Sequence, residues 1–156
     1  MGKDIPLGRI AGIRVGMNPA FLLLAGLFGL SISTRLPNLA PGHADGAYWA
    51  AGFCGAVLLL ISVLAHEVGH ALVARDEGIV VRSMGLTPLG GVTRMETSPK
   101  TPGAEFRVSV VGPIASATCG VILLCVAYVL PDDGLGALAG HVTFYLGAVN
   151  LGLALL

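Results

Sequence analysis

Four runs of apolar residues dominate the chain, and each approaches the length that a membrane-spanning helix requires. The runs cover about residues 19–34, 53–74, 107–130 and 135–156. A helix needs roughly 20 mostly apolar residues to cross the hydrocarbon core of a bilayer. Asn18-Pro19 is typical of a helix start and marks the beginning of the first run. The pattern predicts an all-α polytopic membrane protein with about four transmembrane helices.

The segments between these runs predict a small amount of β-structure. Residues 5–17 alternate loosely between apolar and polar side chains, which favours a short strand or an amphipathic stretch at the membrane surface. Residues 79–81 and 92–95 also have strand character, and Pro88, Gly90 and Gly91 between them indicate a turn. We therefore predict a membrane-associated β-hairpin over about residues 79–96, between the second and third helices.

The composition supports the membrane interpretation. Only 12% of the residues are charged and 54% are hydrophobic, whereas a soluble domain averages about 25% charged residues. The chain therefore lacks the charge that a water-exposed surface needs, and the lipid bilayer is its expected environment. The formal net charge is zero, which argues against nucleic acid as a partner.

The basic residues predict the orientation. Eight of the nine lie before the first run, between the second and third, or at the very start of the third: Lys3, Arg9, Arg14, Arg75, Arg82, Arg94, Lys100 and Arg107. Only Arg35 lies in another loop. Because short cytoplasmic loops carry the excess of Lys and Arg, the N-terminus is predicted to be cytoplasmic. Residues 1–156 then form a single membrane-embedded unit.

A His-Glu-x-x-His group lies inside the second apolar run, at His66, Glu67 and His70. Residues four apart share one face of a helix, so the two imidazoles can bind a single ion. In a zinc hydrolase the ion lowers the pKa of a bound water, and the glutamate accepts the proton of that water as it attacks a carbonyl carbon. Ionisable residues inside a spanning helix are rare and usually functional, so we predict one Zn²⁺ held by His66 and His70, with Glu67 as general base.

A third protein ligand is expected, because catalytic zinc usually has three. Asp76 follows His70 by six residues, but a continuing helix turns it away from the His70 face. Asp132 and Asp133 are predicted on the opposite side of the bilayer, and Glu96 lies in a loop without a positioning motif. None of these is a convincing ligand.

Four stretches together resemble the site-2 protease family of intramembrane zinc metalloproteases, in a bacterial form. They are GRIAGIRVGMNPAFLLL near the N-terminus, HEVGH at residues 66–70, PLGGVTRME after it, and EFRVSVVGPIAS at the start of the third helix. They cover nearly the whole chain in the family's order. The resemblance implies an enzyme of the inner cell membrane that cuts transmembrane segments of regulatory proteins, such as an anti-sigma factor, in regulated intramembrane proteolysis.

The resemblance also implies where the remaining site residues lie. In the family the third ligand is an aspartate that follows an asparagine-containing part of the fourth helix. FYLGAVNLGLALL resembles the approach to that motif, and Asn150 matches its first asparagine. The aspartate is therefore expected beyond Leu156, and residues 1–156 alone are expected to bind zinc weakly and to cleave poorly.

A substrate helix must unwind locally before its carbonyl reaches the metal, and an exposed strand edge could bind the unwound segment by strand addition. The predicted hairpin offers such an edge at residues 90–94, so Gly90, Gly91 and Val92 are candidate substrate-binding residues together with Asn150. A hairpin that only covers the site explains the same sequence equally well.

Two other functions remain open from the sequence. A zinc transporter would need further ligands on other spans, and His141 is the only other histidine in a predicted span. A catalytically inactive membrane binding protein is the second alternative, although an intact Glu67 argues against it, since metal binding does not require that base.

Overall fold

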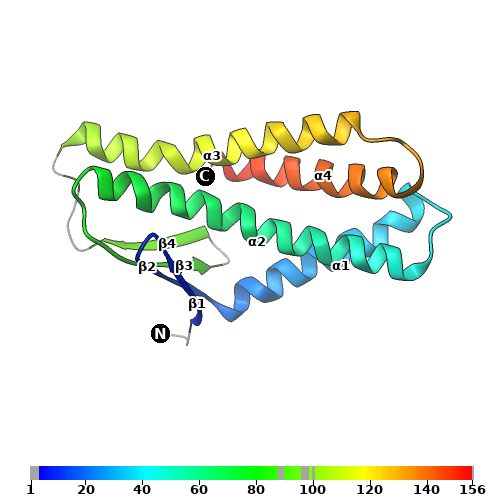
Figure 1. The fold of residues 1–156 in the computed structure, drawn as a ribbon, viewed down its shortest axis with the longest axis horizontal. Helices are drawn as coiled ribbons and strands as arrows, with labels where there is room; N and C mark the ends of the chain where they lie inside the picture. The colour runs from blue at the N-terminus through cyan, green and yellow to red at the C-terminus, as the bar shows by residue number, and fades with distance from the viewer. Residues whose placement is uncertain (1–3, 88–89, 96–98, 100, 156) are drawn as a thin grey trace.

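In the part of the chain that the structure describes, the fold consists of four long helices and a small β-sheet (Figure 1). The computed structural model describes residues 4–87, 90–95, 99 and 101–155. The elements in chain order are β1 (Ile5–Ile10), β2 (Ile13–Met17), α1 (Pro19–Leu39), α2 (Asp45–Asp76), β3 (Val81–Thr87), β4 (Gly90–Met95), α3 (Pro102–Val129) and α4 (Gly134–Leu153).

The first two helices extend beyond the apolar runs that predicted them. The first ends at Leu39 and the second begins at Asp45, well before residue 53. Tyr48 explains the early start of α2, because its buried hydroxyl donates to the Ala40 carbonyl at 2.9 Å and ties the first turn of α2 to the end of α1. The predicted start of α1 is confirmed, since Asn18 Oδ1 accepts from the Ala20 N–H at 2.9 Å.

Three of the helices, α1, α2 and α3, are long and apolar enough to cross a membrane. Their outer surfaces carry large apolar side chains, with Leu23 65%, Phe53 70% and Val129 74% exposed. Such a surface is stable in lipid and unfavourable in water. The fourth predicted span is also a helix, but α4 is not among these three, and it contains the polar side chains of His141 and Asn150.

Glycines bring neighbouring helices close together. A Cβ atom on Gly29 of α1 would lie 2.7 Å from the Gly52 carbonyl oxygen of α2. A Cβ atom on Gly120 of α3 would lie 3.0 Å from the Gly147 carbonyl oxygen of α4. Helix pairs in lipid associate through such small residues, because backbones in close contact gain van der Waals packing.

The sheet is larger than the sequence predicted. Its strand order is β1-β2-β3-β4, with antiparallel β1/β2 and β3/β4 pairs and a parallel β2/β3 pair at its centre. The N-terminal segment therefore forms two strands instead of one. Gly90 and Gly91 were predicted in a turn but belong to β4, where they pair with Thr87 and Leu86. Pairing with β3 draws both glycines into the ladder.

The sheet packs on α2 beside the His-Glu-x-x-His group. Ile13 and Val15 of β2, Met84 of β3 and Ala71 of α2 form one buried cluster. Ala71 directly follows His70, so this contact fixes the sheet against the helical turn that carries the second histidine.

Candidate metal centre

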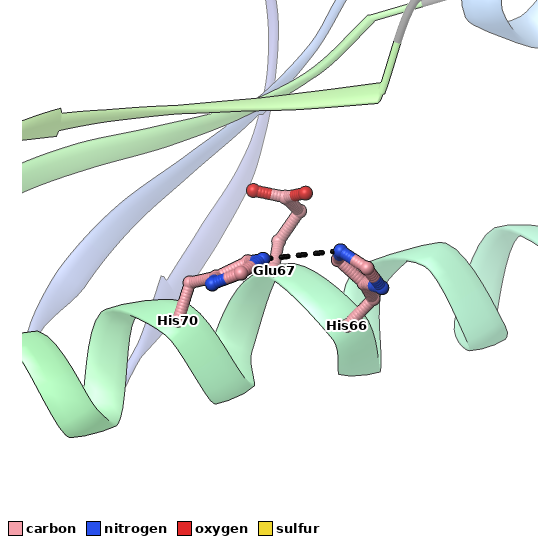
Figure 2. Close-up of side chains that lie close together, drawn as sticks. All are labelled: His66, Glu67 and His70. Carbon is pink, nitrogen blue, oxygen red and sulfur yellow. Dashed lines mark hydrogen bonds between the residues drawn. The ribbon is translucent and has the colours of Figure 1, made fainter. Parts of the chain in front are cut away.

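His66 and His70 face each other across one turn of α2 (Figure 2). Their ring centroids are 4.8 Å apart, and the two Nε2 atoms are 3.1 Å apart. Both side chains are half-buried. The spacing of four residues therefore does what the sequence predicted, and both rings present the same nitrogen to the same space.

The Glu67 side chain rises from α2 beside the two rings, and its carboxylate is directed toward the strands (Figure 2). Glu67 is buried, with 4% of its surface exposed. One ligand atom from each of His66, Glu67 and His70 can be chosen so that all lie within 4.8 Å of one another. Within the described residues this is the only group of three such side chains that could hold a metal ion.

Helix α3 supplies a hydrogen-bond partner to each imidazole. The Nδ1 atom of His70 lies 2.6 Å from the Val108 carbonyl oxygen, and the Nδ1 atom of His66 lies 2.8 Å from Ser116 Oγ. Contacts of this kind orient metal-binding histidines and leave Nε2 for the ion. Neither Val108 nor Ser116 was predicted from the sequence to be part of the site.

Gly112 of α3 lies directly against both rings. A Cβ atom at this position would collide with Nε2 of His66 and Nε2 of His70. The spacing Val108, Gly112, Ser116 places all three residues on one face of α3, and each is buried. In the sequence, the small residues Gly112, Ser116 and Gly120 recur every four positions, but this pattern indicates only close helix packing.

An ion pair joins the end of α2 to α3 near these residues. Arg107 Nε and Nη2 donate to Glu77 Oε1 and Oε2 at 2.5 and 3.0 Å. The hydrogen bond from Arg107 holds the pKa of Glu77 below its usual value. Arg107 directly precedes Val108 in α3. The ion pair therefore holds this part of α3, with the Val108 carbonyl that contacts His70, against the end of α2.

Asn150 lies on α4 and contacts α2, the helix that carries both imidazoles. It is fully buried, its Nδ2 donates to the Leu146 carbonyl at 2.9 Å, and its Oδ1 accepts from Ser62 Oγ. Ser62 precedes His66 by one turn of α2, so the contact holds α4 beside the metal centre. Asn150 itself is not in the group of potential ligands.

The other residues singled out by the sequence lie elsewhere. Gly90, Gly91 and Val92 are in β4, at one edge of the sheet. Asp76, Asp132 and Asp133 are not part of the potential ligand group. His141, which a transporter would need as a ligand, has its Nδ1 atom 2.8 Å from the carbonyl oxygen of Ala137 in its own helix. A carbonyl only accepts, so Nδ1 is the donor. Glu96 lies outside the described residues.

The donor set fits zinc. Zinc binds imidazole nitrogen and carboxylate oxygen, and catalytic sites combine protein ligands with an open position. Here two Nε2 atoms point into one space beside a buried carboxylate, and the missing side chain of Gly112 leaves α3 clear of both nitrogens.

Comparison with known proteins gives a consistent result. The model of peptidase family M50 matches residues 54–154. The chain is 41% identical over 155 residues to zinc metalloprotease Rip3 of Mycobacterium tuberculosis, covering 99% of this chain and 39% of that protein. It is 37% identical to zinc metalloprotease sll0528 of Synechocystis, covering 99% of this chain and 40% of that protein. The chain thus spans about two fifths of the length of these relatives.

A solved structure shares the fold. The site-2 protease from Methanocaldococcus jannaschii superposes with a TM-score of 0.57 and 28% sequence identity. The match covers 96% of this chain and 64% of that one. The helices and sheet that surround the imidazole pair therefore have a counterpart in a protein named for this protease class.

Proposed function

Because the chain belongs to peptidase family M50, we propose that it forms the zinc-binding core of an intramembrane metalloprotease. The proposed reaction is hydrolysis of peptide bonds within or near transmembrane segments of regulatory membrane proteins. The observation that carries this proposal is the His66, Glu67 and His70 cluster on α2, a helix apolar enough to span a membrane.

Each residue of the cluster has a proposed role. His66 and His70 would hold Zn²⁺ through Nε2, and Glu67 would act as general base. A bound zinc ion supplies a Lewis acid that polarises a peptide carbonyl and promotes ionisation of water. The Glu67 carboxylate accepts a proton from the attacking water and returns it to the leaving amide nitrogen. Burial keeps bulk water from competing for that proton.

Metal removal tests the proposed function directly. The full-length protein is reconstituted into liposomes with a membrane protein that has a single spanning helix, and cleavage is followed by gel electrophoresis. We expect 1,10-phenanthroline to stop cleavage and added Zn²⁺ to restore it, because the ion supplies the electrophile. Cleavage that continues at the same rate after zinc has been removed, as measured by atomic absorption, would contradict the proposal.

Strand addition at β4 is the proposed mode of substrate binding. β4 ends the strand order and pairs with β3, in a register that sets Val92 opposite Gly85. The sheet in turn packs on α2 next to His70. A substrate segment extended along β4, over Gly90, Gly91 and Val92, would therefore lie on the side of α2 toward which Glu67 is directed.

The variant Val92→Pro tests this edge. Proline cannot donate a backbone hydrogen bond and restricts the strand, so we expect cleavage to fall by about 2- to 10-fold, the effect of losing one or two net hydrogen bonds. Zinc content should stay unchanged. Leu7→Pro is the matched control, since Leu7 lies at an irregularity of β1, the strand at the other end of the sheet. Equal cleavage by both variants and the wild type would count against strand addition.

The remaining assignments follow from the same proposal. Asn150 would support substrate binding from α4, which its contact with Ser62 holds beside the metal centre. Residues 1–156 would form one membrane-embedded core in the inner cell membrane, with α4 as a fourth span and the N-terminus cytoplasmic. A transmembrane regulator such as an anti-sigma factor is the proposed class of substrate, and its cleavage would release a cytoplasmic fragment.

A further inference from the structure

The two imidazoles are held from α3 by chemically different partners. His70 Nδ1 lies 2.6 Å from the Val108 carbonyl oxygen, which only accepts hydrogen bonds. The hydrogen of the neutral His70 ring is therefore on Nδ1, and its Nε2 carries a lone pair. His66 Nδ1 lies 2.8 Å from Ser116 Oγ, a hydroxyl that both donates and accepts. The Val108 carbonyl thus fixes the hydrogen of the His70 ring on Nδ1, whereas the hydrogen of the His66 ring can be on either Nδ1 or Nε2.

Both positions of the His66 hydrogen are compatible with the observed contacts. With the hydrogen on His66 Nε2, that atom donates to His70 Nε2 at 3.1 Å, and the Ser116 hydroxyl donates to His66 Nδ1. With the hydrogen on His66 Nδ1, that atom donates to Ser116 Oγ, and the two Nε2 lone pairs face the same space. Both rings stay neutral in each arrangement, because one proton moves between the two nitrogens of His66.

Only the second arrangement binds a metal ion through both rings, since a ligand nitrogen must offer a lone pair. We propose that Ser116 is a positioning residue that holds His66 in either arrangement and lets it change from the ring-to-ring hydrogen bond to the metal-binding form. A carbonyl or carboxylate in its place would stabilise one arrangement alone. This inference rests on the proposed zinc site.

The surroundings of Ser116 also favour its role as a positioning residue for His66. Ser116 is 2% exposed, so water does not readily replace a lost hydroxyl. It lies one helical turn after Gly112, whose missing Cβ leaves room for both Nε2 atoms. Helix α3 therefore contributes a hydrogen-bond partner for each ring and a gap opposite the pair, all from one face.

The first test compares zinc affinity in Ser116→Ala and Thr118→Ala. Thr118 is the matched control, because it lies on the same helix but is exposed and donates to the Ile114 carbonyl of its own helix. Zinc affinity of the purified full-length protein is measured by competition with a chromophoric chelator. We expect Ser116→Ala to bind zinc about 10- to 100-fold more weakly than the wild type, and Thr118→Ala to bind it equally well. Ser116→Thr, which keeps a hydroxyl, should recover most of the affinity.

The second test reads the proton positions in the wild-type protein and does not depend on the folding of a variant. Nitrogen-15 NMR of the histidine-labelled protein distinguishes the two neutral ring forms. We expect His66 to carry its hydrogen on Nε2 without zinc and on Nδ1 with zinc, while His70 carries it on Nδ1 in both.

Three outcomes separate the inference from the proposed function. A His66 ring with its hydrogen on Nδ1 before and after zinc addition overturns the inference. So does a Ser116→Ala variant that binds zinc as tightly as the wild type, and in both cases the zinc protease proposal stands. A wild-type protein that binds no zinc overturns the proposed function, and the inference with it.

Discussion

Replacing Glu67 with glutamine is expected to leave zinc bound and to abolish measurable cleavage. Glutamine has nearly the same shape as glutamate, so the packing between α2 and the sheet is kept. It cannot accept the proton of the attacking water, because its amide is not basic. A positioned general base contributes about 10²- to 10⁴-fold to a rate, and we expect a loss of that size. Zinc content by atomic absorption and cleavage in liposomes measure the two effects.

Glu105→Gln is the control for this change. Glu105 is an exposed acidic residue in the first turn of α3 and is not part of the potential ligand group. Its replacement removes the same charge and should leave both zinc content and cleavage unaltered. A Glu67→Gln protein that cleaves at the wild-type rate would show that the base lies elsewhere, although zinc binding by the histidines would be unaffected.

Replacing Gly112 with alanine is expected to remove both zinc and activity. The added methyl group would collide with Nε2 of His66 and with Nε2 of His70, so either the rings or α3 must move. Overpacking of this kind costs about 1–3 kcal/mol of stability. The displaced rings no longer point at one ion, and we expect zinc affinity to fall by about 100-fold or more.

Gly26→Ala is the matched control, since a Cβ atom on Gly26 of α1 meets nothing within 4 Å. Zinc stoichiometry and cleavage should match the wild type in this variant, and its thermal stability should not fall, because alanine favours a helix more than glycine does. If Gly112→Ala binds zinc normally while its rate of cleavage is unchanged, the ion does not lie between α2 and α3, and the arrangement of the metal centre is wrong.

The sequence predicted the features that depend on neighbours along the chain. The four-residue spacing of His66 and His70 guaranteed that both rings share a face once the segment became a helix. Asn18-Pro19 correctly marked the start of α1, because a cap and its helix are adjacent in sequence. The apolar runs located the helices but not their ends, since Tyr48 and other packed residues extend α2 beyond its most apolar part.

Other features that the sequence did not predict join distant segments. β2 and β3 pair in parallel although α1 and α2 separate them in the sequence. This pairing makes the N-terminal segment part of a four-stranded sheet. The contact between Asn150 and Ser62 joins α4 to α2 in the same way. No local periodicity carries information about such pairs, because the partners meet only when the helices have packed.

The sequence by itself determined that this chain is mostly membrane-type helix and that one of its helices carries two imidazoles and a carboxylate on neighbouring positions. Only the tertiary structure decided what surrounds them. Ser116, Gly112 and the Val108 carbonyl became parts of the metal centre because α3 packs against α2 in one register. A serine or glycine has no chemical signature of its own in a sequence, and its role arises from the atom that the fold places opposite it.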